Sequence, residues 1–547
     1  MKCLFELLNN FEHTIISDKN LNPQIASLAF DSRAVKPGAL FFALPGTHTT
    51  GNVFIPQAIK NGATAVIFQG SIAPEILDQN KNTAFIQVND ARFVMAPVSA
   101  SFFDNPSKKL GVIGVTGTEG KSSTVSFIWQ LLRLTGHKAG FISTVQYSTG
   151  GEAIANSEHQ TTPEAPIIQS RLAEMVKNGC EYAVIESSSH GLSPKLNRTG
   201  CIDFDCGIFM NVTLEHLEFH KTFEQYRDDK ANLFRKLDEC DHEKIICGNK
   251  VKVPSFGIVN LEDESADYFI HATKKPVIGF TTEGKAGKQA AESVNAKPLP
   301  PIPDGIPILV GRNVASARFG LTFDMTEPNM ADAEYKPLHK LVHVKAPLPG
   351  AFNAYNLMAA IAAVSRLTGT SVENVAEKTA QLTSVRGRMT VIDKGQPFEL
   401  IIDYAHTPSS FETIFPPVRR RCKGKMIALF GSGGERDLQK RPLQGEIAGK
   451  FCDILILTDE DPRGENPEEL LRQIAVGAEK AGKKLGENLF ITPDRPSAIR
   501  QAFKMAKKDD IVLLLGKGHE NSIIYKDHVL PYDELKEAEK ALEELSF

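Results

Sequence analysis

The chain has 547 residues, of which 42% are hydrophobic and 23% are charged, and its formal net charge is −4 at pH 7. Because domains usually span roughly 100–200 residues, this length predicts about three of them. A nearly balanced charge disfavours nucleic acid and anionic membrane as partners, since both bind strongly basic surfaces. We therefore expect an ordinary soluble, globular protein with a large buried core.

The cysteines and the start of the chain bear on where the protein works. The eight cysteines are scattered and form no CxxC pair, which disfavours a disulfide framework and a structural zinc and fits a reducing cytoplasm. The start MKCLFELLNN has no long apolar core, and no stretch approaches the roughly 18–20 apolar residues of a membrane span. We expect a cytoplasmic protein without membrane insertion.

Apolar runs and turn residues divide the chain into three blocks and predict an α/β fold. Residues 1–108 mix short apolar runs with turns, which indicates a small mixed α/β N-terminal domain. In residues 109–347, strands alternate with helices, which predicts a central, doubly wound, parallel sheet. We interpret the stretch near 250–344 in this block, which includes a proline- and lysine-rich segment, as a variable surface insertion. Residues 348–547 predict a Rossmann-like C-terminal domain.

Three apolar strands in the last block each end in a polar or glycine-rich loop. They are Ile427–Phe430 before GSGGERD, Ile454–Thr458 before DEDPRGE, and Ile511–Leu515 before GKGHE. In open α/β sheets, ligands bind at the carboxyl ends of parallel strands. Three such loops in one block therefore predict a single composite binding site.

The strongest local signal for chemistry follows the first strand of the central block. That strand enters a loop with Gly117 and Gly120, and Lys121 and Ser122 then begin a helix. Small residues let backbone N–H groups converge on phosphate oxygens, and the helix N-terminus adds a favourable dipole. In such loops the lysine reaches the terminal phosphates and the serine hydroxyl joins Mg²⁺. We predict a nucleotide-binding phosphate loop, in which the Glu119 carboxylate repels a triphosphate unless it turns outward.

Acidic and imidazole side chains later in the same block add a metal site to this loop. Glu186 directly follows the apolar run Tyr182–Ile185, which places a carboxylate at the end of a strand. The segment Asn211–His220 is dense in carboxylates and imidazoles, although a single one, such as His220, is more often structural. Because Mg²⁺ in phosphate-loop enzymes takes oxygen ligands, these segments together predict a metal–nucleotide site.

These motifs, in this order, resemble those of the Mur ligase family, most closely the members that add the third amino acid. The resemblance covers nearly the whole chain, excepting the stretch near 250–344. It implies an ATP-dependent ligase of cell-wall synthesis that joins a free amino acid to a UDP-N-acetylmuramoyl dipeptide through an acyl phosphate. It also implies that ATP and Mg²⁺ bind between the second and third domains, and we expect a monomer.

The resemblance carries the family's nucleotide, metal and catalytic roles onto residues of this chain. The expected ATP contacts are Gly117, Thr118, Glu119, Gly120, Lys121, Ser122, Ser123, Asn353, Asn356, Arg388, Asp403 and His406. The expected Mg²⁺ ligands are Ser122, Glu186, His216 and Lys230, the last as a carbamate, and catalysis is assigned to Lys121, Glu186, His216 and Lys230. Carbamylation makes chemical sense because it converts an ammonium into an oxygen ligand for Mg²⁺. From spacing alone, Lys230 is an ordinary solvated helix lysine.

Substrate roles follow from the same resemblance. Ser32, in a segment similar to the family's uridine-nucleotide site, precedes Thr50–Asn52, where the family usually has Asp-Gly-His. The muramoyl peptide is assigned to Thr161, Thr162, Ser188 and Arg198, the last of which stands two residues later than the family pattern. The incoming amino acid is assigned to Arg436, Glu460, Asp461, Arg463, Gly516 and Glu520.

The identity of the amino acid depends on the loop DEDPRGE. Family members that add meso-diaminopimelate have DNPR here, and this chain replaces the asparagine by Asp461. A carboxylate repels a distal carboxylate and attracts a distal amine. Arg463 remains and could be neutralised by Asp461 or Glu465. We therefore favour lysine or ornithine, with meso-diaminopimelate as the alternative.

Two other functions remain possible at this point. Folylpolyglutamate synthase is a related ligase, but the uridine-type first domain and the GGERD and GKGHE loops favour the cell-wall substrate. A nucleotide-binding scaffold without ligase activity is the second alternative. The retained set of Lys121, Glu186, His216, Lys230 and Arg436 disfavours it.

Overall fold

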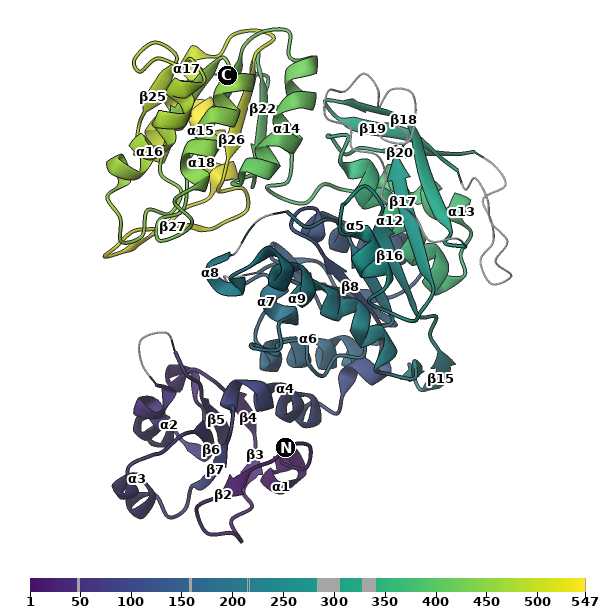
Figure 1. The fold of residues 1–547 in the computed structure, drawn as a ribbon, viewed down its shortest axis with the longest axis vertical. Helices are drawn as coiled ribbons and strands as arrows, with labels where there is room; N and C mark the ends of the chain where they lie inside the picture. Colours follow the sequence, from purple (N-terminus) through teal and green to yellow (C-terminus); the bar gives the residue numbers. More distant parts are fainter. Residues whose placement is uncertain are drawn as a thin grey trace.

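The chain folds into three units that follow one another along the long axis of the molecule (Figure 1). The computed structural model describes residues 1–46, 50–156, 160–213, 215, 217–282, 305–326 and 341–546. The central unit lies between the N-terminal and C-terminal units, so only it can share sites with both. Within these ranges, no helix is long and apolar enough to cross a membrane.

The N-terminal unit is a five-stranded sheet in the order β2-β7-β6-β5-β4, parallel except for β2. The strands of the sheet are β2 (Thr14–Ile15), β4 (Ser27–Ala29), β5 (Ala39–Ala43), β6 (Ala63–Gln69) and β7 (Ala84–Val88), and β1 (Lys2–Cys3) pairs separately with β3 (Gln24–Ile25). Its helices are α1 (Leu4–Leu7), η1 (Ser32–Ala34), η2 (Gly51–Phe54), α2 (Ile55–Lys60), α3 (Pro74–Gln79), α4 (Ala91–Phe102) and η3 (Pro106–Lys109). Asp90 caps α4 by accepting two backbone N–H groups, and α4 lies on the side of this unit that is nearest the central unit (Figure 1). The predicted mixed α/β domain is confirmed.

The central unit is built on an eleven-stranded sheet in the order β11-β10-β9-β12-β8-β13-β16-β17-β18-β19-β20. Seven strands from β9 to β18 run parallel, and antiparallel hairpins extend both edges. The first strands are β8 (Gly111–Thr116), β9 (Ala139–Ile142), β10 (Gln146–Ser148), β11 (Ile154–Ala155), β12 (Tyr182–Glu186) and β13 (Cys206–Phe209). The later ones are β16 (Phe256–Asn260), β17 (Val277–Thr282), β18 (Ile308–Ala317), β19 (Gly320–Thr326) and β20 (Val342–Ala346), with a separate hairpin of β14 (Glu243–Ile246) and β15 (Asn249–Lys252).

Helices cover both faces of this sheet, as the doubly wound prediction requires. On one face lie α5 (Lys121–Leu134), α12 (Asn353–Thr368) and α13 (Val372–Lys378). On the other lie α6 (Ala165–Lys177), α7 (Ser189–Leu192), α9 (Phe223–Arg235) and α10 (Ala266–Ile270). The remaining helical turns are α8 (Leu217–His220), η4 (Lys236–Asp238) and η6 (Thr379–Gln381).

Two expectations about the central block need correction. The stretch near 250–344 is not a surface insertion in its described parts, because β16 to β20 are strands of the main sheet. Buried side chains alternate with half-buried ones in β19 and with exposed ones in β20, so the apolar runs typical of central strands are missing there. The chain also leaves the central core only after Leu382, later than the boundary expected at residue 347, because α12 packs on the central sheet.

The C-terminal unit is a six-stranded sheet in the order β21-β22-β26-β23-β24-β25, parallel except for β21. The strands of the sheet are β21 (Thr390–Ile392), β22 (Glu399–Asp403), β23 (Met426–Phe430), β24 (Ile454–Leu457), β25 (Leu489–Ile491) and β26 (Ile511–Leu515), and β27 (Ser522–Ile524) pairs separately with β28 (Val529–Pro531). Its helices are α14 (Pro408–Arg421), α15 (Lys440–Phe451), α16 (Pro467–Lys480), α17 (Arg495–Met505) and α18 (Glu534–Glu544). The three strands with predicted ligand loops, β26, β23 and β24, are neighbours, so their loops meet at one edge.

Candidate active site

The phosphate loop joins β8 to α5, the strand–loop–helix arrangement expected from the sequence. Gly120 has a φ of +82°, and a Cβ there would lie 2.7 Å from Asn356 Oδ1, so only glycine fits. The side-chain carbonyl of Asn211 accepts the backbone N–H groups of Thr118 and Glu119 at 3.0 and 2.8 Å. Asn211, at the end of β13, thereby holds the loop in shape.

The functional side chains of the loop meet groups from two other elements. Ser122 donates a hydrogen bond to Glu186 Oε1 at 3.0 Å, which confirms that the end of β12 faces the start of α5. The carboxylate of Glu186 also accepts the Thr144 backbone N–H at 2.8 Å. From the C-terminal unit, Arg388 donates to Ser122 Oγ at 3.3 Å. Oxygen donors and a guanidinium therefore converge where a phosphate loop holds the terminal phosphates.

Lys230 lies on α9, directly beneath the phosphate loop. Its side chain is fully buried, and Nζ donates to the carbonyl of Gly117 at 2.6 Å. Burial, together with the nearby charge of Lys121, lowers the pKa of Lys230 well below its usual range. Residue spacing alone suggested that Lys230 is an ordinary solvated lysine on a helix, and the structure corrects that expectation. His216, assigned to the same metal site, lies outside the described residues.

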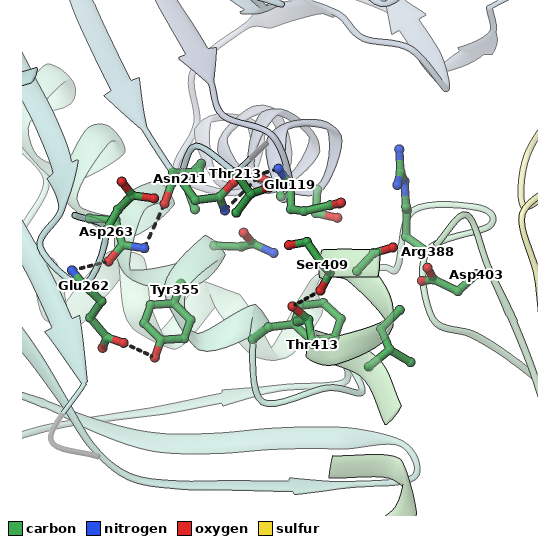
Figure 2. Close-up of a pocket in the computed structure, with 18 residues that line it drawn as sticks. Glu119, Asn211, Thr213, Glu262, Asp263, Tyr355, Arg388, Asp403, Ser409 and Thr413 are labelled. Atoms are coloured by element: carbon green, nitrogen blue, oxygen red, sulfur yellow. Dashed lines mark hydrogen bonds between the residues drawn. The ribbon is translucent and has the colours of Figure 1, made fainter. Parts of the chain in front are cut away.

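A cavity of about 310 Å³ separates the central and C-terminal units beside the phosphate loop (Figure 2). It contains six residues assigned to ATP from the sequence, namely Glu119, Gly120, Ser123, Asn356, Arg388 and Asp403. Asn353 does not line it, because its side chain donates to the Pro349 carbonyl and accepts from Asn356. The Glu119 carboxylate turns towards the C-terminal unit and accepts a hydrogen bond from Thr407 at 3.2 Å.

Sequence reasoning missed the far wall of this cavity. Figure 2 shows Glu262 and Asp263 facing Arg388 and Asp403 across it, with Tyr355 beside Glu262. The Tyr355 hydroxyl donates to Glu262 Oε2 at 2.9 Å, which joins α12 to the loop after β16. The signal available in the sequence was the apolar strand before Asn260, which lay inside the stretch interpreted as an insertion.

A second cavity, of about 620 Å³, opens at the carboxyl edge of the C-terminal sheet. Residues assigned to the substrates line it from both units: Thr161 from the central unit, and Arg436, Glu460, Asp461, Arg463 and Glu520 from the C-terminal unit. His406, assigned to ATP, lines this cavity and not the first one. A Cβ on Gly516 would lie 2.9 Å from Glu460 Oε2, so the absence of a side chain there makes room for Glu460. The three predicted loops therefore form one composite site.

The charges of this cavity are organised by a lysine that the sequence reasoning did not single out. Lys517 is buried, and its Nζ lies 2.9 Å from Asp461 Oδ1 and 2.5 Å from Glu520 Oε2. Burial alone would lower the pKa of Lys517, but the two carboxylates raise it. Burial also raises the pKa of Glu460.

The expected neutralisation of Arg463 by Asp461 or Glu465 is not seen. Asp461 accepts from Lys517 and from the Ile524 backbone N–H, at 2.9 Å each. Glu465 forms a two-pronged ion pair with Arg441 at 2.7 and 2.8 Å. The Nε of Arg463 is buried without a hydrogen-bond partner in the described part of the chain.

The residues assigned to the muramoyl peptide cluster beside Glu186. Thr162 donates to the Glu186 carbonyl at 2.8 Å and accepts the Ser188 backbone N–H at 2.9 Å. Arg198 donates to the Thr162 carbonyl at 3.0 Å, so it lies beside the other residues assigned to the muramoyl peptide. Ser32 lies in η1 of the N-terminal unit, where its carbonyl accepts from Asn61 at 2.8 Å.

Three α/β units, a phosphate loop and two cavities lined by residues of the central and C-terminal units are the features of a nucleotide-dependent enzyme. The chain belongs to the Mur ligase family. Residues 24–102 match the description "Mur ligase family, catalytic domain", residues 115–364 "Mur ligase middle domain", and residues 387–518 "Mur ligase, glutamate ligase domain". The expectation of an ATP-dependent, amide-bond-forming ligase of peptidoglycan synthesis is confirmed.

Individual relatives agree with this assignment. The chain is 51% identical over 540 residues to a UDP-N-acetylmuramyl-tripeptide synthetase of Treponema denticola, covering 96% of this chain and 94% of the relative. It is 34% identical to a UDP-N-acetylmuramoyl-L-alanyl-D-glutamate–2,6-diaminopimelate ligase of Geobacillus kaustophilus, covering 96% of each chain. A solved structure with the latter title is 24% identical, covers 96% of both chains and has a TM-score of 0.56, which shows the shared fold.

Proposed function

We propose that the protein joins a free diamino acid to the terminal carboxylate of UDP-N-acetylmuramoyl-L-alanyl-D-glutamate, with ATP converted to ADP and phosphate. The names of the two relatives support these substrates. The observation that carries the proposal is the second cavity, where Thr161 of the central unit faces Arg436 and Glu460 of the C-terminal unit. Two substrates held by these two sets of residues meet within reach of the phosphate loop.

The reaction then has two steps. The substrate carboxylate attacks the γ-phosphorus of ATP, which forms an acyl phosphate and releases ADP. The amine of the diamino acid next attacks the acyl carbon, and the tetrahedral intermediate collapses as phosphate leaves and the amine loses a proton. Lys121 and Arg388 bring positive charge to the transferred phosphoryl group, and catalysis of this kind depends chiefly on positioning and electrostatics.

The residues present fit Mg²⁺. Ser122 Oγ and Glu186 Oε1 lie 3.0 Å apart, and both are oxygen donors of the kind that Mg²⁺ prefers. Among the described residues no three His, Cys, Asp or Glu side chains gather as a metal site, so phosphate oxygens and water would complete the shell. When bound, Mg²⁺ neutralises charge on the phosphates. Lys230 as a carbamate would add an oxygen ligand, and its lowered pKa supplies the neutral amine that reacts with CO₂.

Lysine or ornithine is the favoured diamino acid. Asp461 and Glu520 bring two carboxylates to the distal end of the substrate, beside the single buried ammonium of Lys517, and Glu460, whose pKa is raised by burial, adds a third acidic group. A distal ammonium gains from the surplus, whereas a distal carboxylate is repelled. One observation favours meso-diaminopimelate instead, namely the Arg463 guanidinium, whose Nε has no partner in the described ranges.

Release of ADP tests the proposal directly. The protein is incubated with ATP, Mg²⁺ and the UDP-linked dipeptide, and lysine, ornithine and meso-diaminopimelate are compared side by side by kcat/KM. ADP release should require both the dipeptide and an amino acid, and ATP turnover indifferent to both would refute the proposal. A clear preference for meso-diaminopimelate would refute the charge argument at Asp461.

The variant Asp461→Asn isolates that argument. The amide keeps an oxygen for Lys517 and the Ile524 N–H but removes one negative charge. At an effective dielectric constant near 20, a charge about 5 Å away contributes roughly 3 kcal/mol, so the ratio of meso-diaminopimelate to lysine use should rise by about two orders of magnitude. Glu468→Gln, at an exposed ion pair on α16, is the matched control and should leave the ratio unchanged.

A further inference from the structure

An ion triad joins the N-terminal unit to the central unit. Glu164 Oε1 accepts from Arg92 Nη1 at 3.2 Å and from Arg198 Nη2 at 2.8 Å. Arg92 belongs to α4 of the N-terminal unit, whereas Glu164 directly precedes α6 and Arg198 follows α7 in the central unit. The side chains are 19%, 7% and 11% exposed, so the triad is largely shielded from water.

Both arginines extend the triad to a backbone carbonyl. Arg92 donates through Nη2 to the carbonyl of Pro45 at 3.4 Å, at the end of the segment that resembles a uridine-nucleotide site. Arg198 donates through Nη1 to the carbonyl of Thr162 at 3.0 Å, beside Glu186. A continuous chain of polar contacts therefore runs from the nucleotide end of the proposed substrate to its reacting end.

The charges of the triad do not balance. Two guanidinium groups share one carboxylate, which leaves one net positive charge in a shielded place. Arg198 Nε and Glu164 Oε2 are buried without hydrogen-bond partners in the described part of the chain. An uncompensated cation next to Thr162 suits an anionic group of a ligand.

We propose that Arg92 is a positioning residue for the nucleotide-linked peptide, which it aligns by holding Glu164, and through it Arg198, against the loop that ends at Pro45. This inference rests on the proposed substrate. It also assigns the N-terminal unit a part in aligning the reacting carboxylate, beyond binding the nucleotide. Because Arg92 lies in neither cavity, its loss should affect binding of the UDP-linked dipeptide and leave ATP binding nearly unchanged.

Steady-state kinetics of Arg92→Gln, Arg92→Lys and Glu164→Gln test the inference. Losing a partly shielded charge-assisted contact should raise KM for the UDP-linked dipeptide by about tenfold in Arg92→Gln, with KM for ATP within about twofold. Arg92→Lys keeps the charge but cannot bond Pro45 and Glu164 at once, so it should restore only part of the affinity. Arg472→Gln, at an exposed ion pair on α16, is the matched control.

The outcomes separate the possible roles. A double variant of Arg92→Gln and Glu164→Gln should be no worse than the poorer single variant, because both act through one contact. An unchanged KM for the dipeptide in folded Arg92→Gln overturns the inference. An equal loss for all three substrates together with a lower melting temperature also overturns it, because that pattern marks a purely structural residue. Failure of the proposed function itself would appear in the unmodified protein, as ADP release without the dipeptide.

Discussion

Replacing Arg388 by methionine is expected to impair ATP use far more than folding. Arg388 precedes β21 in the C-terminal unit and crosses to the central unit, where Nη2 lies 3.3 Å from Ser122 Oγ. Its guanidinium lies over the ring of Tyr404, with the carbon 4.7 Å from the centroid. Methionine keeps much of the side-chain volume and removes the charge, so packing between the units should persist.

The size of the effect follows from these contacts. A hydrogen bond from a charged donor contributes about 1.5–3 kcal/mol, and a partly shielded cation–π contact about 1 kcal/mol. A total near 3 kcal/mol corresponds to a fall of about two orders of magnitude in kcat/KM for ATP. ADP release at varied ATP concentration measures it, with both other substrates saturating.

Two further variants sharpen this test. Arg388→Lys retains a charge but loses the planar group that lies on Tyr404, so it should recover only part of the loss. Arg419→Met, which breaks an ion pair with Asp453 on the same unit, should leave kcat/KM for ATP unchanged. If Arg388→Met keeps kcat/KM within threefold of the unmodified protein, the assignment of Arg388 to the ATP site is refuted.

Two more predictions concern buried titratable groups. Lys230→Met should lower kcat by about two orders of magnitude or more. The unmodified protein should lose activity when CO₂ is removed and regain it when bicarbonate is added. Full activity without CO₂ would contradict a carbamate at Lys230. His242 is buried and bonded to Asp205 at 2.9 Å. Burial alone would lower its pKa below 6.5, but hydrogen bonds to Asp205, Cys240 and the Leu237 carbonyl together raise the pKa to about 9. This raised pKa should increase the free energy of unfolding by up to about 3 kcal/mol below pH 6.5, and the increase should be lost as the pH rises through 9. Urea unfolding should therefore give a lower free energy of unfolding at pH 9.5 than at pH 6, and His242→Gln should abolish this difference. An equal drop in the variant would contradict the assignment to His242.

Local features were predictable because they depend on residues close together in the chain. The phosphate loop follows from an apolar strand, two glycines and a helix start, and Gly120 indeed has the positive φ that such a loop requires. The meeting of the loops after β23, β24 and β26 follows from parallel strands, whose carboxyl ends share an edge.

The described part of the stretch near 250–344 was misread for a physical reason. Every second side chain is half-buried in β19 and exposed in β20, and polar residues among them, such as Thr322, Asp324 and Lys345, resemble a polar surface loop. Only the pairing of β19 with β18 and β20 reveals them as the edge of the main sheet. Glu262, in the wall of the nucleotide cavity, was missed with them.

The sequence by itself determined the class of chemistry, because the phosphate loop, the acidic strand end and the order of motifs are local patterns. Only the tertiary structure decided how charges are shared. Lys517 stands 56 residues from its partner Asp461, and Arg92 stands 72 residues from Glu164. Electrostatic pairing depends on distance in space and on burial, and neither can be read from separation along the chain. In the folded protein Asp461 is therefore part of an ion-pair network with Lys517, whereas the Nε of Arg463 has no hydrogen-bond partner in the described part of the chain.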